Sequence, residues 1–198
     1  EVLRHFEQAG VASVLALRGD PPKDNPFALA NGELKTAKEL VELISSDSGL
    51  EIGVAAFPEV HPESPDMQHD SKVLALKQAA GASFAVTQLF FSVGAYTDLV
   101  ASAREAGATL PIVPGVMPIA NAKQVVRMAE LSGAAIPPEL LARFDAAKDD
   151  AEARAIGMAY STQLAVDRVA AGAPGIHIFS LNHHVAAIEL ARGAGLCR

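Results

Sequence analysis

The chain has 198 residues, half of them hydrophobic, which is enough to build the core of one domain or of two small ones. Its 16 basic and 23 acidic residues give a net charge of −7, which argues against a general nucleic-acid binder, because such proteins carry basic surfaces. No apolar run approaches the roughly 20 residues of a membrane-spanning helix. The single cysteine, Cys197, excludes an intrachain disulfide and favours a reducing compartment, so we expect a cytoplasmic protein.

One unit recurs along the chain: an amphipathic helix, a glycine and, a few residues later, a short apolar strand. In chain order, the strands expected from this pattern are 11–17, 52–57, 84–91, 111–117 and 175–181. The expected helices are 1–9, 33–46, the residues before Gly81, the residues before Gly107, 121–132, 138–146, 150–171 and 184–194. The glycines predicted to follow helices, where left-handed backbone favours Gly, are Gly10, Gly49, Gly81, Gly107 and Gly172.

The strict alternation of helices and strands predicts an α/β fold. The strands are apolar almost throughout, which is typical of a parallel sheet covered by helices on both faces. Three helices fill the long gap between the fourth and fifth strands, and Pro137-Pro138 is placed to begin the second of them. No linker interrupts the sequence, so we expect a single domain over 1–198.

Residues that could contribute to a site lie at or near the end of every expected strand, and most of these sets carry polar side chains. In chain order they are Arg18-Gly19-Asp20, 58–63, Thr87-Gln88, 114–118 and 180–184. Because ligands bind at the carboxyl ends of parallel strands, these groups predict one site assembled from separate strand ends. The sequence fingerprints of dinucleotide-binding, P-loop, serine-hydrolase and zinc-protease sites are absent.

Several of these polar residues also have a plainer interpretation. His61, His69 and Asp70 carry metal-ligating groups, but their spacing matches no closed structural metal site, and we expect no bound metal. Lys77 is either a surface lysine whose stem covers apolar neighbours or a ligand contact. Gln88, which interrupts an apolar strand, is either a satisfied core group or a ligand contact.

Five segments, in this order and each at a strand end, resemble the bacterial methylenetetrahydrofolate reductase family. They are LALRGDPP (15–22), AAFPEVHPES (55–64), AAGASFAVTQLFF (79–91), PIVPGVMPIANAKQ (111–124) and GIHIFSLN (175–182). The resemblance implies a (β/α)8 TIM barrel that holds FAD at the carboxyl ends of its strands. It also implies the family's reaction, in which hydride passes from NAD(P)H through FAD to 5,10-methylenetetrahydrofolate and yields 5-methyltetrahydrofolate.

The resemblance carries over individual ligand positions. The positions that match FAD contacts are Arg18, Gly19, Asp20, Ala37, Phe57, His61, Ser64, Asp70 and Lys77. Asp20 also matches an aspartate of the catalytic site, whose carboxylate can accept hydrogen bonds from the pterin amino group and ring N–H. The other implied folate contacts are Gln88, Gln124 and His183. The resemblance implies a folate substrate and allows a homo-oligomer. From the charge and the apolar runs, we expect no nucleic-acid or membrane partner.

The sequence departs from the family pattern at five ligand positions. Phe57 stands where Tyr is usual, which keeps the ring and loses the hydroxyl. Val73 and Leu76 stand where polar FAD contacts occur, and each lost polar contact weakens binding by on the order of 1–3 kcal/mol. Met128 replaces a Phe that packs against folate, and His183 stands where the family has Arg. We therefore expect weakened FAD binding, or direct hydride transfer between nicotinamide and folate.

The family has three strands before LALRGDPP, and the first carries the glutamate that serves as general acid. These strands have no counterpart in the 198 residues, and neither Glu59 nor Glu63 stands at that glutamate's position. A complete barrel takes about 250 residues, and five strands cannot close one. We therefore expect an incomplete barrel, made of the last five parallel strands and their helices, that is inactive on its own.

Three hypotheses follow. The first is a flavin-dependent folate reductase, represented by the C-terminal five-eighths of its barrel. The second is a related folate- or deazaflavin-dependent enzyme on the same scaffold, favoured by the lost polar positions at Val73 and Leu76. The third is a non-catalytic folate-binding paralogue, favoured by the missing general acid.

Overall fold

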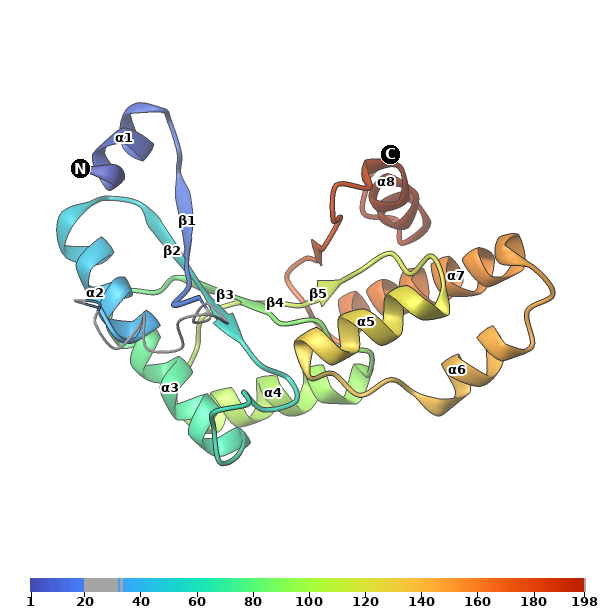
Figure 1. Cartoon of the computed structure of the whole chain (residues 1–198). Coiled ribbons are helices and arrows are strands. Elements are labelled where there is room, and N and C mark those ends of the chain that lie inside the picture. The colour runs from blue at the N-terminus through green and yellow to red at the C-terminus, as the bar shows by residue number, and fades with distance from the viewer. Residues whose placement is uncertain (20–31, 33, 198) are drawn as a thin grey trace.

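The computed structural model describes residues 1–19, 32 and 34–197 and alternates helices with short strands (Figure 1). The helices are α1 (Val2–Gln8), α2 (Ala37–Asp47), α3 (Met67–Ala79), α4 (Val93–Glu105), α5 (Ala122–Ser132), α6 (Pro138–Asp145), α7 (Asp150–Ala170) and α8 (His184–Gly193). The strands are β1 (Ser13–Ala16), β2 (Glu51–Ala56), β3 (Phe84–Thr87), β4 (Ile112–Val113), β5 (Gly115–Val116) and β6 (His177–Ile178). All the expected helices are present, and the α/β class is confirmed.

The strands form two parallel groups. β1, β2, β3 and β4 pair in that order, and β5 pairs with β6. The prediction of one strand over 111–117 is wrong, because Pro114 has no N–H to donate and separates β4 from β5. The strands predicted over 84–91 and 175–181 are also too long, since the observed pairing ends at Thr87 and Ile178.

Side-chain caps explain where several helices begin. Thr36 and Glu39 form a reciprocal capping box at the start of α2, in which each side chain bonds the other residue's backbone N–H. The side chains of Asp66, Asn121 and Asp149 accept backbone N–H bonds at the starts of α3, α5 and α7. These residues are the local signals that make the helix starts predictable from sequence.

The predicted glycine stops are confirmed at four of five positions. The glycines with left-handed backbone are Gly10 (φ 78°), Gly81 (φ 122°), Gly107 (φ 89°) and Gly172 (φ 91°). The prediction for Gly49 is wrong, because α2 ends in extended backbone at Ser48. The Gly49 N–H instead donates to Glu7 Oε1 at 2.9 Å, which ties the end of α2 to α1.

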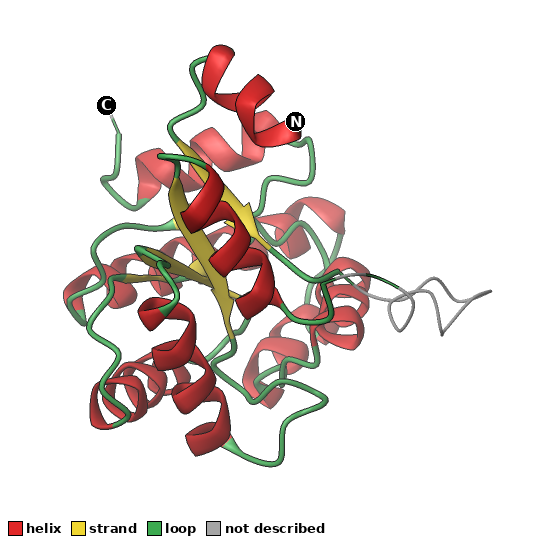
Figure 2. Cartoon of the chain, turned by 90° about the vertical axis from the view of Figure 1, so that its left-hand side faces the viewer, coloured by secondary structure: helices red, strands yellow, loops and turns green. Residues whose placement is uncertain are grey.

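Two apolar clusters make up most of the interior. One lies between the four-stranded sheet and α2–α4, and includes Val41, Val54, Leu74 and Leu99. The other joins the segment after β3 to the helices that follow β5, α5–α7 among them. Figure 2 shows the strands in the middle of the molecule with helices around them.

The described strands do not close into a barrel. β1 pairs only with β2, and β6 pairs only with β5, so β1 and β6 are edges among the described strands. Near the β1 edge, Leu15 is 45% exposed and Leu17 49%. Among the helices that the structure describes, none is long and apolar enough to cross a membrane.

Candidate functional site

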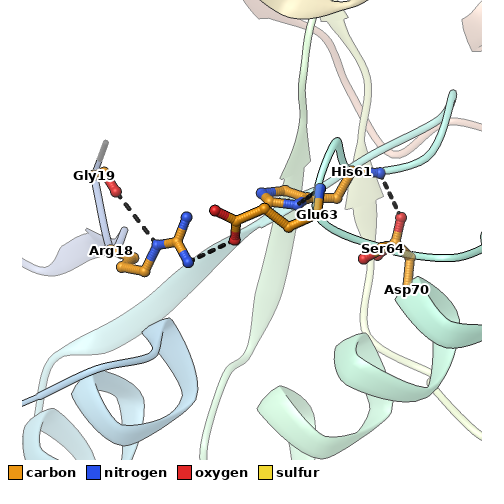
Figure 3. A network of polar contacts seen from close by, with 6 residues as sticks. All are labelled: Arg18, Gly19, His61, Glu63, Ser64 and Asp70. Atoms are coloured by element: carbon orange, nitrogen blue, oxygen red, sulfur yellow. Dashed lines mark hydrogen bonds and ion pairs between the residues drawn. The ribbon is translucent and has the colours of Figure 1, made fainter. Parts of the chain in front are cut away.

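The carboxyl ends of β1 and β2 come together through an ion pair. The guanidinium Nη1 of Arg18 lies 2.7 Å from Oε2 of Glu63, and its Nε donates to the Gly19 carbonyl at 3.4 Å (Figure 3). Hydrogen bonding from Arg18 holds the pKa of Glu63 below its ordinary value. We call Arg18-Gly19 together with residues 57–64 the loop region. Polar groups from two of the five expected strand ends therefore meet here.

Asp70, on the first turn of α3, accepts two hydrogen bonds from the loop region. Its Oδ2 accepts the backbone N–H of His61 at 2.7 Å, and its Oδ1 accepts the hydroxyl of Ser64 (Figure 3). Val60, next to His61, has a φ of 64°, a left-handed conformation that is uncommon for a β-branched residue. Both carboxylate oxygens of Asp70 therefore hold the loop in a conformation that its own sequence disfavours.

The His61 ring has a fixed orientation. Its Nδ1 accepts the Glu63 backbone N–H at 3.0 Å, so the proton of the neutral ring lies on Nε2. The Phe57 and His61 rings meet edge to face, with centroids 4.6 Å apart. The ring therefore offers one N–H donor, beside an aromatic side chain and within the same loop as the ion pair.

Lys77 lies beneath the strand and not in the loop region. Its Nζ donates to the Ala55 carbonyl of β2 at 3.2 Å. Burial lowers the pKa of Lys77, and the nearby Asp70 carboxylate partly opposes that shift. The lysine thus stabilises the contact between α3 and β2.

The two predicted glutamines lie in a second region, residues 87–91 and 115–124, which we call the amide region. The Gln88 N–H donates to the Ala56 carbonyl at 2.8 Å, and its Oε1 accepts the Leu89 N–H at 2.8 Å. In Gln124, Oε1 accepts the Ala120 N–H at 2.7 Å, and Nε2 donates to the Pro118 carbonyl at 3.3 Å. The side-chain amide of each glutamine therefore bonds the backbone of nearby residues in its own segment.

Helix α7 contributes residues that sequence reasoning did not single out. Arg168 donates to the carbonyls of Phe90 and Gly115, Ser161 accepts the Ile119 N–H, and Tyr160 donates to the Phe91 carbonyl. A helical spacing is the signal that could have found two of them: Ser161 and Arg168 share the buried face with Gly157, Leu164 and Ala165. A serine and an arginine on such a face require internal partners.

Asp20, a predicted ligand position, falls outside the described residues. Two other predicted ligand positions lie apart from these networks. Ala37 is the first residue of α2 and half-buried. His183 is exposed at the start of α8, where its N–H donates to the Ser180 carbonyl at 2.8 Å. Among the described residues, no three His, Cys, Asp or Glu side chains form a group that could hold a metal ion.

Comparison with known proteins gives one consistent family. The model of the methylenetetrahydrofolate reductase family matches residues 1–195. Methylenetetrahydrofolate reductase (NADH) 1 of Arabidopsis thaliana is 38% identical over 207 residues, covering 98% of this chain and 35% of that protein. The 5,10-methylenetetrahydrofolate reductase of Escherichia coli is 34% identical over 185 residues, covering 91% of this chain and 60% of that protein.

A solved structure is similar in fold. It is an uncharacterized protein from Clostridium thermocellum, described as binding two copies of 5-methyl-5,6,7,8-tetrahydrofolic acid. It superposes with a TM-score of 0.56 at 18% identity, covering 81% of this chain and 59% of that one. The chain therefore spans roughly a third of its plant relative and somewhat over half of its bacterial relative and structural neighbour.

Proposed function

Because the chain belongs to the methylenetetrahydrofolate reductase family, we propose that it supplies the cofactor- and folate-facing part of such a reductase. The reaction is hydride transfer from NAD(P)H through FAD to 5,10-methylenetetrahydrofolate, which gives 5-methyltetrahydrofolate. The observation that carries the proposal is the meeting of Arg18, His61 and Glu63 at the carboxyl ends of two adjacent parallel strands. That is the end at which parallel α/β folds bind ligands.

The residues of the loop region fit FAD. Arg18 offers a guanidinium, His61 offers an imidazole N–H, and Phe57 offers an aromatic surface beside it. Cationic donors suit the phosphates of the cofactor, and aromatic surface suits its ring. When bound, FAD would accept hydride from the nicotinamide and pass it on to the folate.

The chain's own residues hold this surface in place. Asp70 and Ser64 act through the loop, because the Asp70 oxygens accept the His61 N–H and the Ser64 hydroxyl. Lys77 supports the strand beneath. We propose direct cofactor contacts for Arg18, Gly19, Asp20, Ala37, Phe57 and His61. We also propose that the Asp20 carboxylate accepts hydrogen bonds from the pterin.

On the folate side we propose Gln88 and Gln124 as the principal ligands and His183 as a weaker one. An amide can donate to one edge of a heterocycle and accept from it with the same group. Gln88 already accepts the Leu89 N–H, and Gln124 accepts the Ala120 N–H. These bonds fix the orientation of each side-chain amide and leave it few hydrogen-bonding directions for a ligand. Directed donors and acceptors discriminate among ligands better than mobile ones.

We also propose that the chain is a single domain and forms five of the eight strand positions of a TIM barrel. The exposed leucines near the unpaired edge of β1, Leu15 and Leu17, support this, because an edge strand of a barrel should continue into the next strand. The glutamate general acid would then lie on a preceding strand. Residence in the cytoplasm and a homo-oligomeric state stay predictions from cysteine content and family resemblance.

The test is a chimera in which the part of the Escherichia coli relative that precedes its match is joined to this chain. We expect a flavin absorption spectrum and NAD(P)H oxidation that depends on methylenetetrahydrofolate. The matched control is the same chimera with Arg18→Met, which should lose flavin at low cofactor concentration. A folded, flavin-loaded chimera without turnover would contradict the proposal.

A second candidate rests on Val73 and Leu76, which lie on α3 where the family has polar cofactor contacts. Leu76 is 52% exposed and offers no hydrogen bond. A chimera that binds folate but no FAD would favour the related deazaflavin-dependent enzyme or the non-catalytic folate-binding protein. Turnover that appears only with added deazaflavin would separate these two.

A further inference from the structure

Arg168 is a cation buried in the interior of the protein. Its side chain is 0% exposed, and its guanidinium carbon lies 3.8 Å from the centroid of the Phe90 ring. Among the described residues no carboxylate forms an ion pair with it, and its Nε has no partner. Burial lowers its pKa to about 10, so the side chain remains charged at neutral pH. Such a charge is costly to bury, and its hydrogen bonds must offset that cost.

Those hydrogen bonds reach the backbone after Gln88 directly and Thr87, before it, through Gly115. Arg168 Nη2 donates to the Phe90 carbonyl at 2.8 Å, and Nη1 donates to the Gly115 carbonyl at 3.1 Å. The Gly115 N–H in turn donates to Thr87 Oγ1 at 2.8 Å. Gln88 therefore stands between two positions, Thr87 and Phe90, that are both tied to the same buried network.

The same face of α7 also holds the segment that carries Gln124. Ser161 Oγ accepts the Ile119 N–H at 3.0 Å and donates to the Gly157 carbonyl at 2.8 Å. A Cβ on Gly157 would lie 2.3 Å from the Ile119 carbonyl oxygen, so helix and loop are in close contact. Gln124 is bonded to the residues on either side of Ile119, Pro118 and Ala120.

We propose that α7 sets the placement of the two glutamines relative to each other. Arg168 is the positioning residue for Gln88, and Ser161 is the positioning residue for Gln124. A long helix is a rigid spacer, so bonds from one helix face to both segments fix their separation. The consequence for folate binding rests on the proposed function, whereas the positioning itself is a property of the chain.

The positioning is tested by amide hydrogen exchange on the whole chain, comparing Arg168→Met with Arg154→Met. Arg154 lies on α7 and pairs with Glu189 at the surface, so the control makes the same change outside the network. We expect Arg168→Met to increase exchange at the Leu89 and Gly115 amides by about tenfold or more, and Arg154→Met to leave them unchanged. Unchanged exchange in Arg168→Met would overturn the proposal.

A second variant keeps the test decisive if Arg168→Met does not fold. Ser161→Ala removes one hydroxyl without changing the shape of α7. We expect faster exchange at the Ile119 and Ala120 amides and no change at Leu89. Uniform changes over the whole chain would indicate a general loss of stability and would count against specific positioning.

The functional consequence is tested by titration with 5-methyltetrahydrofolate. We expect Arg168→Met to weaken binding roughly tenfold and Arg154→Met to leave it unchanged. In a Gln88→Ala background, Arg168→Met should cause no further weakening, because Arg168 acts through Gln88. Additive losses, or unchanged affinity in Arg168→Met, would overturn this part of the proposal. A wild-type chain that binds no folate would instead overturn the proposed folate site, while the exchange experiment still decides the positioning.

Discussion

The loop region and the amide region are built in different ways. In the loop region the Arg18–Glu63 ion pair is partly open to solvent, with side-chain exposures of 30% and 61%. In the amide region the bonds from Thr87, Ser161 and Arg168 run from buried side chains to backbone groups. Exposed ion pairs contribute about 0–1 kcal/mol, whereas a buried group that loses its partner costs about 1–3 kcal/mol. The amide region is therefore held rigidly, whereas the loop region is free to adjust.

This contrast matches the ligands we propose for the two regions. The amide region would recognise a pterin by directed hydrogen bonds, which requires fixed groups. The loop region would hold a larger and more polar cofactor, which an adjustable loop accommodates more easily. Perturbations of the amide region should therefore cost more stability than perturbations of the loop region.

The largest effect is expected from Gly157→Ala in α7. The added Cβ would meet the Ile119 backbone carbonyl at 2.3 Å, and backbone cannot move aside as a flexible side chain does. We expect a loss of about 3 kcal/mol in the free energy of unfolding, measured by urea denaturation. Gly175→Ala is the control, because its Cβ would meet nothing within 4 Å. A neutral Gly157→Ala would show that the helix and loop are not in rigid contact.

Thr87→Val should have the next largest effect. The substitution keeps the shape of the side chain but removes the oxygen that accepts the Gly115 N–H. Because that N–H is buried, we expect a loss of about 2 kcal/mol. The exposed Thr97, which donates to the Gly94 carbonyl in α4, provides the control Thr97→Val. Equal losses in the two variants would remove the distinction between buried and exposed bonds.

Lys77→Met should change how stability depends on pH. Burial lowers the pKa of Lys77 in the folded protein, while the unfolded chain keeps the ordinary value of 10.5. Between the two values the unfolded state binds more protons, so this lysine makes the free energy of unfolding rise with pH. Lys77→Met should remove that rise, as measured by urea denaturation across the alkaline range. Lys72→Met, an exposed change on the same helix, should leave the slope as it is.

The smallest effect is expected from Glu63→Gln in the loop region. We expect the free energy of unfolding at neutral pH to fall by less than about 0.5 kcal/mol. Since Arg18 lowers the pKa of Glu63, the ion pair contributes above the ordinary carboxyl pKa and its contribution is lost as pH falls through the lowered one. Denaturation at low and at high salt would check this. A loss as large as that of Thr87→Val would mean that the two regions are equally rigid.

Local chemistry explains how much of the fold the sequence predicts. The helix starts at Thr36, Asp66, Asn121 and Asp149 are visible because the capping side chain and its partner lie within three residues of each other. Strand ends depend on neighbours that are distant in sequence, and so the predicted strands are too long. The sequence shows a proline at position 114, but it does not show that the strands on either side of it belong to different sheets.

The site was predictable to a smaller extent. Arg18 and Glu63 follow separate strands, so their convergence follows from parallel pairing once the strands are recognised. That Asp70 and Lys77 bond the protein's own backbone was not visible, because a polar residue near a strand end has the same sequence signature in either role. Arg168 was missed because its partners, Phe90 and Gly115, are 78 and 53 residues away.

The break at Pro114 has a consequence for folding. It leaves β1–β4 and β5–β6 as separate ladders. Paired residues are 27 to 38 positions apart in the first ladder (112 − 85 and 51 − 13) and 62 apart in the second (177 − 115). The bonds between these halves include those from Arg168 to Phe90 and from Tyr160 to Phe91, which close loops of 78 and 69 residues. Because closing a long loop costs chain entropy before its contacts form, these bonds should be among the last to be made. The contacts between the two ladders should therefore form late in folding, although they are rigid once the chain has folded.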